Sequence, residues 1–419
     1  MESVPRTLVV NFNAPELNQL AAALAQRCEL VRYVRPYVNK GRPWERGLEA
    51  LPWAGRLYAG TFGRRRMNQP ALALQTHEAG VLPDLCAAGL QRARVLPAEW
   101  RRRGSNALYK RLRESVAEAA VRFVPQARCV VAYEGFALPA FAALRQSGAG
   151  RAVLNYPVAH HRQRRRVRAE ENEREPTFAS TWPDFDDWPP GHEARLDEEI
   201  DLADAVLVGS QYAADSFVAE GIARERVQVV PYGVDLDVFQ PAAQPPEVDR
   251  PFRAIFAGQL TQRKGLSYLL RGYERFAQPG TELTLVGAPV GDGRALAPWA
   301  HLFRHVAHQT RPALAQRYRD SDAFVFPTLL EGMGLVVLEA MACGLPVIVT
   351  DNGPGDLVRD GVDGFVIPDR DPEAIADALD RLHRDRALRL EMGRRAALRA
   401  REFSWDTYTA RVCALLAAQ

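Results

Sequence analysis

The chain contains 419 residues, which is too many for one ordinary hydrophobic core because domains usually contain about 100–200 residues. Hydrophobic residues make up 47% and charged residues 25% of the chain, and these values exclude a disordered chain, a collagen and a coiled coil. The formal net charge of +3 excludes a polybasic protein that binds nucleic acid through its overall charge. Lysine is rare among the 54 basic residues and occurs only as Lys40, Lys110 and Lys264, so a lysine within a motif is a candidate functional residue.

The sequence lacks the usual marks of export and membrane insertion. The run Met1–Val10 is short and has no small-residue cleavage site, so it does not resemble a signal peptide. No segment approaches the ~20 apolar residues that a membrane-spanning helix needs. The cysteines are scattered and without CxxC spacing, at positions 28, 86, 129, 343 and 413, which predicts reduced thiols and no cysteine-based metal site. We therefore expect a cytoplasmic protein, with peripheral contact to the inner face of the membrane left open.

Short apolar runs alternate with helical patterns along the whole chain. In the first half, the runs that predict strands are Thr7–Phe12, Cys129–Tyr133, Ala152–Tyr156, Ala205–Gly209 and Val227–Val230. In the second half, they are Ala254–Ala257, Glu282–Val286, Ala323–Pro327, Pro346–Thr350 and Gly364–Ile367. The clearest helical patterns are Asn18–Arg27, Leu108–Val124 and Leu335–Cys343. This alternation predicts α/β architecture with parallel, doubly wound sheets.

Two segments of the first half are rich in arginine, Arg64–Arg66 and Arg92–Arg113. Leu108, Leu112 and Val116 lie at near-helical spacing, so one face of this part of the chain is apolar. One interpretation is a core helix whose arginines are solvated. The other is docking on an anionic membrane surface, where each basic residue adds about 1 kcal/mol.

A proline-rich segment interrupts the alternation between residues 240 and 251, with the sequence QPAAQPPEVDRP. Such a composition is typical of an interdomain linker. We therefore predict an N-terminal domain over residues 1–240, a linker over 241–251 and a C-terminal domain over 252–400. A last helix over 401–419 is a candidate to pack back on the N-terminal domain. A cleft between two such domains suits an enzyme that joins a donor to an acceptor, because ligands bind beyond the carboxyl ends of the strands.

A polar turn follows the predicted strand Ala254–Ala257. Gly258 ends the strand, and the turn carries Arg263 and Lys264 into the next helix. Two adjacent cations at a strand–helix turn can hold a diphosphate and stabilise its charge as a leaving group. The alternative interpretation is a solvated basic turn.

A second motif at 323–344, AFVFPTLLEGMGLVVLEAMACG, combines a buried strand, a loop and a helix. Gly332 and Gly334 allow the backbone N–H groups at the helix start to approach an anion. Glu331 precedes the helix and Glu339 lies eight residues later, about 12 Å along a helix. Carboxylates accept hydrogen bonds from hydroxyl groups, so this spacing suits a nucleotide sugar, with the sugar at one carboxylate and the ribose at the other. The alternative is an ordinary helix carboxylate and a partner of the helix dipole.

At this point the order of the elements resembles the retaining GT-B glycosyltransferases of family 4, also called glycosyl transferases group 1. The resemblance rests on Gly258 with Lys264-Gly265, on EGMGLVVLEAMACGLPVIVT from Glu331 and on DGVDGFVIP from Asp360. It covers roughly Val206–Leu379, and PYGVDLDVF at 231–239 resembles the turn that leads to that family's linker. The glycines of the last segment, Gly353, Gly355, Gly361 and Gly364, are expected to serve turns. The resemblance implies the GT-B fold: two Rossmann-like, doubly wound α/β domains that face each other across a cleft.

The resemblance also implies roles for the donor-side residues. Glu339 would bind the ribose hydroxyls, and Lys264 would neutralise the diphosphate. Glu331 would contact the donor sugar and phosphates together with the backbone of Gly332, Met333, Gly334 and Leu335. The family usually has an arginine directly after the strand-end glycine, Gly258, but this chain has Gln259. Arg263, which is next to Lys264, is then the candidate to supply the missing cation.

The acceptor side departs from the family. The first strand is followed by NFNAPELNQL rather than by a glycine-rich loop, so an acceptor near Asn11–Glu16 would be held differently. Family members place a histidine just past a strand of this half, and His160 and His161 follow the strand in AVLNYPVAHH. Histidine is the usual proton-handling side chain near neutral pH. The alternatives are Glu134, at the end of another strand, and two polar loop histidines within a basic run.

The loop PDFDDW at 183–188 contains Asp184 and Asp186, a spacing that other glycosyltransferases use to hold a metal–diphosphate. Here the pair lies far in sequence from the phosphate elements, so we predict no metal site and no cofactor. The co-substrate expected from the resemblance is a nucleotide diphosphate sugar, UDP- or GDP-linked.

The predicted function is retaining transfer of a hexose-type sugar to a hydroxyl of a glycan or lipid-linked acceptor, without a required metal and without nucleic acid. The catalytic candidates are Lys264, Arg263, Glu331, His160 and His161. Two alternatives stay open: a nucleotide-sugar epimerase or hydrolase on the same fold, and a binding module that performs no transfer.

Overall fold

The computed structural model describes residues 4–51, 58, 65, 67, 69–92, 97–148, 150–182, 191–244 and 249–418. The strands are β1 Thr7–Val10, β2 Leu30–Arg35, β3 Thr76–Glu78, β4 Cys129–Tyr133, β5 Arg151–Asn155, β6 Ala205–Val208, β7 Val227–Val229, β8 Phe252–Ala257, β9 Thr281–Val286, β10 Phe303–Val306, β11 Ala323–Phe326, β12 Val347–Thr350 and β13 Gly364–Ile367. The helices are α1 Pro15–Gln26, α2 Pro43–Glu49, α4 Pro70–Gln75, α5 Val81–Arg92, α6 Ala98–Val121, α7 Leu138–Gln146, α8 His161–Arg174, α9 His192–Leu202, α10 Gln211–Val218, α11 Leu266–Phe276, α12 Arg311–Arg319, α13 Leu335–Ala342, α14 Pro372–Arg384, α15 Arg386–Ala400 and α16 Trp405–Ala417.

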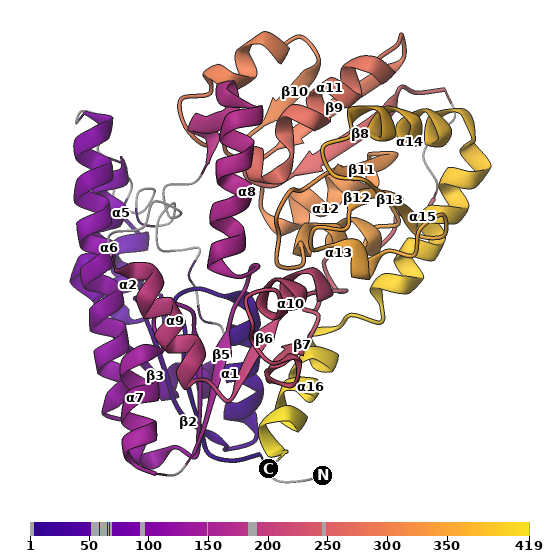
Figure 1. The fold of residues 1–419 in the computed structure, drawn as a ribbon. Helices are drawn as coiled ribbons and strands as arrows, with labels where there is room; N and C mark the ends of the chain where they lie inside the picture. The colour runs from indigo at the N-terminus through magenta and orange to yellow at the C-terminus, as the bar shows by residue number, and fades with distance from the viewer. Residues whose placement is uncertain are drawn as a thin grey trace. The chain divides into compact units, whose positions relative to one another are not determined.

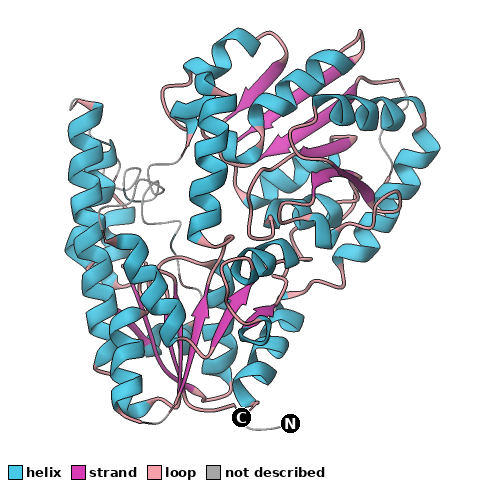
Figure 2. Cartoon of the chain, in the orientation of Figure 1, coloured by secondary structure: helices cyan, strands magenta, loops and turns pink. Residues whose placement is uncertain are grey.

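The strands form two sheets of the α/β type (Figures 1 and 2). One sheet has the order β3-β2-β1-β4-β5-β6-β7 and the other has the order β10-β9-β8-β11-β12-β13. The pairs that flank β1 and β8 are parallel. Counted within each sheet, both orders begin 3-2-1-4-5-6, which is the doubly wound Rossmann order. The expected α/β class is therefore confirmed.

Every strand predicted from the sequence is present, with ends that differ by at most two residues. The central strands β1, β6, β11 and β12 are buried along their whole length, because helices cover both faces of a parallel sheet. Such strands are continuous apolar runs, which is why they can be recognised. The edge strand β10, with the sequence FRHV, exposes Arg304 and His305. Its sequence therefore contains no apolar run from which the strand could be predicted.

The chain divides into two compact units. The first contains Met1–Tyr156, Gly191–Leu207 and Thr409–Gln419, and the second contains Pro157–Pro190 and Val208–Tyr408. The second unit therefore includes α8 and α10, which precede the proline-rich segment in the sequence. The sequence-based boundary at 241–251 differs from this division and stays a prediction.

The loop after β4 in the first unit is held by a buried acid. The Glu199 side chain, from α9, accepts hydrogen bonds from the N–H groups of Gly135, Ala137 and Leu138 at 2.6, 3.0 and 3.1 Å. Burial raises the pKa of Glu199 to about 7, and the three donors oppose this rise. This contact fixes the start of α7 and the loop that begins at Glu134.

Among the described residues, no helix combines the length and the apolar character that crossing a membrane requires. All five cysteines are described, and each is a free thiol, as expected from their scattered positions.

Candidate functional site

The predicted diphosphate site lies at the switch point of the second sheet. β8 and β11 are neighbours where the strand order reverses, and doubly wound sheets bind ligands there, beyond the carboxyl ends of the strands. Lys264 follows β8 in a 3₁₀ turn, η6 Gln262–Lys264, and Glu331 follows β11. Lys264 Nζ forms an ion pair with the Glu331 carboxylate. The topology thus brings together two predicted site residues that lie far apart in the sequence.

Arg263 joins the same contact. Its Nη1 donates to the Leu330 carbonyl at 3.1 Å and lies 3.4 Å from Glu331 Oε1. Its own carbonyl accepts hydrogen bonds from Leu329 N at 3.0 Å and from Thr328 Oγ1 at 3.1 Å. The turn after β8 is therefore tied to the loop after β11, and two cationic side chains face one carboxylate.

Both cations are largely buried, with exposed fractions of 7% for Lys264 and 9% for Arg263. Burial, and then the adjacent Arg263, lower the pKa of Lys264 well below its usual value, while the contact with Glu331 opposes this effect. The Phe326 ring lies 4.8 Å from Lys264 Nζ and adds a cation–π contact. An anion that enters this environment is attracted strongly, because the surroundings are poorly solvated, and it favours the charged form of the lysine.

The loop before α13 presents main-chain groups. Gly332 N–H donates to Glu331 Oε1 at 3.2 Å, and Gly334 caps α13 with φ +82°, a conformation that favours glycine. The Met333 side chain is 1% exposed and its sulfur accepts a hydrogen bond from Tyr232 N–H at 3.0 Å. Because the Met333 side chain is packed away, Met333 can contact a ligand through its main-chain groups. Leu335, the first residue of α13, has main-chain groups at the same helix start.

Gly332 is required by close packing. A Cβ at this position would lie 1.7 Å from the Pro157 carbonyl oxygen, and the backbone atom cannot move aside easily. We expect Gly332→Ala to destabilise the folded protein by roughly 1–3 kcal/mol and to weaken donor binding. The control is Gly47→Ala on α2, where nothing lies within 4 Å of the new Cβ. Urea unfolding midpoints check the difference, and equal midpoints for both variants would contradict it.

Glu339 lies within α13, in the same unit. Burial raises its pKa to about 7, Arg311 lowers it and Asp235 raises it; the last two side chains pair with each other at 3.1 Å. Among the described residues, no side chain forms a hydrogen bond with the Glu339 carboxylate. Within the part of the chain that the structure describes, it is an acceptor without a side-chain donor, which suits hydroxyl groups of a ligand.

Position 259 carries a glutamine where the resemblance leads us to expect an arginine. Gln259 is exposed just beyond Gly258, which has φ +146°. Arg263, rather than Gln259, lies beside Glu331. The predicted replacement of the family's arginine by Arg263 fits this placement.

The two histidines begin α8. His160 is 1% exposed, its Nδ1 accepts from Arg162 N–H at 3.2 Å, and its own N–H donates to Ser216 Oγ at 2.8 Å. The His160 and His161 rings stack at 4.1 Å, and burial lowers the pKa of His160 to about 4. His160 is therefore neutral at pH 7 and caps the helix with Nδ1, so the ring proton is assigned to Nε2. A proton-handling role for either histidine stays a prediction.

The loop after β1 is built by asparagine instead of glycine. The Asn11 side chain accepts from Ala14 N–H at 2.8 Å and donates to the Ala14 carbonyl at 2.9 Å and to Tyr33 Oη at 2.7 Å. These contacts fix the turn into α1 without a flexible backbone. Glu134 lies at the carboxyl end of β4, next to β1, and stays a candidate on the acceptor side.

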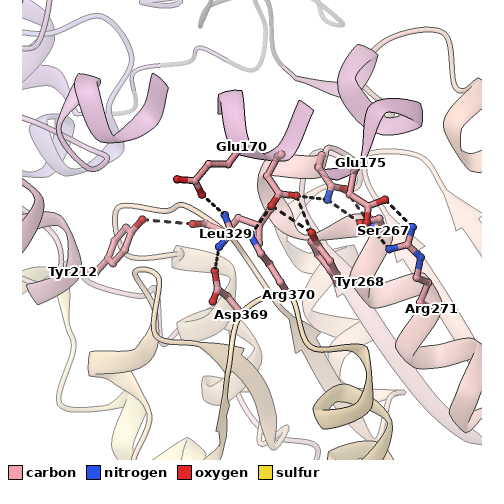
Figure 3. Close-up of polar contacts among 11 residues, drawn as sticks. Glu170, Glu175, Tyr212, Ser267, Tyr268, Arg271, Leu329, Asp369 and Arg370 are labelled. Atoms are coloured by element: carbon pink, nitrogen blue, oxygen red, sulfur yellow. Dashed lines mark hydrogen bonds and ion pairs between the residues drawn. The ribbon is translucent and has the colours of Figure 1, made fainter. Parts of the chain in front are cut away.

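Sequence reasoning did not predict that residues 157–182 belong to the second unit. Figure 3 shows acidic side chains at the end of α8 directed toward α11 and toward the loop before α14. Glu171, which is 0% exposed, bonds with Gln262 of the cationic turn at 2.8 Å. The only sequence signal for the buried position of Glu171 is a run of acids within a helix. Such a run resembles any solvated helix face.

Several predicted features lie outside the described residues. These are Asp184 and Asp186, considered above as metal ligands, and parts of the two arginine-rich segments, including Arg64, Arg66 and Arg94. Their predicted roles stay untested.

The comparison with known proteins supports the family resemblance predicted for the C-terminal half of the chain. Residues 251–385 match the model of the family described as Glycosyl transferases group 1. The chain is 33% identical over 226 residues to a D-inositol 3-phosphate glycosyltransferase of Paenarthrobacter aurescens, a match that covers 49% of this chain and 55% of that protein. The protein of the same name from Mycobacterium avium is 34% identical over 241 residues, covering 53% and 56%. The chain thus spans about half the length of the curated relatives it matches.

Solved structures share the fold over nearly the whole chain. A sucrose-phosphate synthase from Thermosynechococcus elongatus has a TM-score of 0.66 at 19% identity, covering 98% of this chain and 97% of that one. Anabaena Alr3699/HepE in complex with UDP and glucose has a TM-score of 0.62 at 14% identity, covering 98% of both. These likenesses concern the fold alone, and they agree with the GT-B fold class expected from the sequence. Residues 251–385, which match the model of the glycosyl transferases group 1 family, carry the ion pair of Lys264 with Glu331.

Proposed function

We propose that the protein is a glycosyltransferase that moves a hexose-type sugar from a nucleoside diphosphate sugar to a hydroxyl of a glycan or glycolipid acceptor. The observation that carries the proposal is the meeting of Arg263, Lys264 and Glu331 at the switch point of the second sheet. When the bond from the anomeric carbon to the diphosphate oxygen breaks, negative charge develops on the leaving group. In this proposal, two buried cations and the N–H groups before α13 would stabilise that charge.

The comparisons support the same class of reaction. The family match covers the cationic turn and α13, and the relatives are named glycosyltransferases. The titles of the Alr3699/HepE structures name UDP and UDP-glucose as their ligands, so UDP-glucose is the first donor to test. Retention and independence of metal follow from the resemblance to the family and belong to the proposal. So does a cytoplasmic location.

Contact with a membrane surface is a further part of this proposal. Trp100 on α6, Leu82 on α5 and Leu74 on α4 are exposed by 71%, 74% and 82%, and all three lie in the first unit with the arginine-rich segments. Exposed apolar side chains, in a unit whose sequence also carries arginine-rich segments, suit an anionic lipid surface. A lipid-linked acceptor would be reached from such a surface.

The proposal is tested by following donor, nucleotide and sugar together. Purified protein is incubated with UDP-glucose or GDP-mannose, with and without a panel of hydroxyl acceptors, in buffer with EDTA. Transfer predicts nucleoside diphosphate release that depends on an acceptor, and a product whose anomeric configuration by NMR matches the donor. Release without any acceptor would instead indicate a hydrolase, an altered sugar an epimerase, and saturable binding without release a binding module.

A further inference from the structure

The donor unit contains a segment from outside the family match. Residues 157–182 belong to the second unit, and Pro157 packs against Gly332 of the donor loop. Further along, α8 carries Glu170 and Glu171, and Glu175 follows its last residue, Arg174. These acids approach α11 and Arg370 (Figure 3). The segment therefore touches both the loop after β11 and the turn after β8.

Glu171 is the buried centre of these contacts. It is 0% exposed, and Arg370 Nε lies 2.6 Å from its Oε1. Tyr268 Oη donates to its Oε2 at 3.1 Å, and Gln262 Nε2 donates to the same oxygen at 2.8 Å. A buried carboxylate with a charged partner and two neutral donors is costly to disrupt, because each partner is left unpaired when it is removed.

Gln262 transmits this contact to the cationic turn. It is fully buried and is the first residue of η6, directly before Arg263 and Lys264. Its side chain bonds with Ser267 at both ends, as Nε2 donates to Oγ at 2.8 Å and Oε1 accepts from the Ser267 N–H at 3.1 Å. Its backbone N–H donates to Thr181 Oγ1 at 2.8 Å. The side chain that orients the turn is thus held by Glu171 on one side and by α11 on the other.

The partner of Glu171 is itself held in an unusual conformation. Arg370 has φ +59°, a region that non-glycine residues rarely adopt and that costs about 1–3 kcal/mol. Its guanidinium contacts Glu170 at 3.1 Å and Asp369 at 2.6 Å in addition to Glu171. Such backbone strain persists only where the surroundings fix the residue, and here they are the acids of α8.

We propose that Glu171 is a positioning residue for the diphosphate: through Gln262 it fixes the turn that aims Arg263 and Lys264 at the β-phosphate of the donor. The proposal rests on the proposed function, which assigns a diphosphate to these cations. Its physical basis is that charge stabilisation depends on preorganised geometry. Without Glu171, the cations remain in the chain but the turn that carries them loses its buried anchor.

The test compares the affinities for UDP and UMP, which differ by the β-phosphate, using isothermal titration calorimetry. In the wild type, we expect UDP to bind more tightly than UMP. In Glu171→Ala, we expect the preference for UDP to fall at least 10-fold while the affinity for UMP changes less than threefold. The matched control is Glu175→Ala, which removes the ion pair with Arg271 at the residue that follows α8 but no contact of Gln262. That variant should keep the wild-type preference, since a merely structural loss of docking would affect both variants alike.

A second variant keeps the test decisive if Glu171→Ala does not fold. Gln262→Ala leaves the pair of Glu171 with Arg370 intact and removes the link to the turn, together with the two hydrogen bonds of the Gln262 side chain to Ser267, so it should show the same loss of preference. Folded Gln262→Ala protein with the wild-type preference would overturn the proposal, as would folded Glu171→Ala with that result. Failure of the wild type to prefer UDP over UMP, repeated with GDP and GMP, would instead overturn the proposed function on which this inference rests.

Discussion

Replacing Lys264 with alanine is expected to lower the turnover number for sugar transfer by at least about 100-fold, the size of effect seen when one preorganised charge-stabilising group is removed from an active site. Lys264 is 7% exposed and shares Glu331 with Arg263. A charge in such surroundings acts through few intervening water molecules, so its loss is not compensated by solvent. The KM for the donor should change less than the turnover number, because charge on the leaving group grows toward the transition state.

The measurement is the steady-state rate of UDP formation with a saturating acceptor. Lys110→Ala is the control, because Lys110 is one of the other two lysines and lies exposed on α6 in the first unit. Lys264→Arg keeps the charge but not the compact shape, and it should recover only part of the rate. Wild-type turnover in Lys264→Ala would remove the leaving-group argument.

Replacing Glu339 with alanine is expected to weaken donor affinity by about 10- to 100-fold, which corresponds to the loss of hydrogen bonds to a charged group. The prediction follows from its placement in α13 with a carboxylate that has no hydrogen-bonding side chain among the described residues. Calorimetric titration with UDP-glucose measures the affinity. The control is Glu373→Gln, which changes a highly exposed acid on α14, and an unchanged affinity in Glu339→Ala would remove the ribose role.

The same residue gives a pH dependence with a defined sign. The pKa of Glu339 is raised from 4.5 to about 7, mainly by burial, so the fraction of ionised acceptor grows between pH 6 and pH 8. Donor affinity of the wild type should rise over this interval, while Glu339→Gln should show no such rise. UDP-glucose serves as ligand because its diphosphate, esterified at both ends, lacks the terminal phosphate ionisation near pH 6.

As the pH rises, the contribution of Glu339 to the stability of the folded protein should fall, whereas donor affinity should rise. Because the folded pKa exceeds the unfolded one, the folded state binds more protons between pH 4.5 and about 7, and the contribution of this group to stability falls as pH rises through that window. Glu339→Gln should therefore be more stable than the wild type at pH 8 and lose this advantage at pH 5. Such a trade of stability for binding is typical of functional sites.

The sequence predicts the elements of the donor unit well because their signals are local. β11 and β12 are buried on both faces and appear as continuous apolar runs, and Gly332 and Gly334 mark the loop before α13. The pairing of Lys264 with Glu331 follows once β8 and β11 are placed on either side of the switch point. Edge strands such as β10 mix polar and apolar residues and give no such signal.

The contacts of α8 could not be predicted in the same way. Glu171 and Gln262 lie 91 positions apart, and no local pattern distinguishes a buried acid from its solvated neighbours on a charged helix. His160 is a second case: its position after β5 predicts a proton carrier, but the sequence does not show that its Nδ1 caps α8 or that burial lowers its pKa to about 4. Tertiary burial sets the surroundings of both side chains, and burial is not visible in a single segment of sequence.

The central claim is that a diphosphate binds at the switch point of the second sheet, between β8 and the start of α13. A crystal structure of the protein with UDP tests it most directly. We predict a β-phosphate oxygen at about 3 Å from Lys264 Nζ, in place of part of the Glu331 contact, with the ribose hydroxyls on the Glu339 carboxylate. A UDP bound elsewhere, with Lys264 still paired to Glu331 alone, would contradict the account.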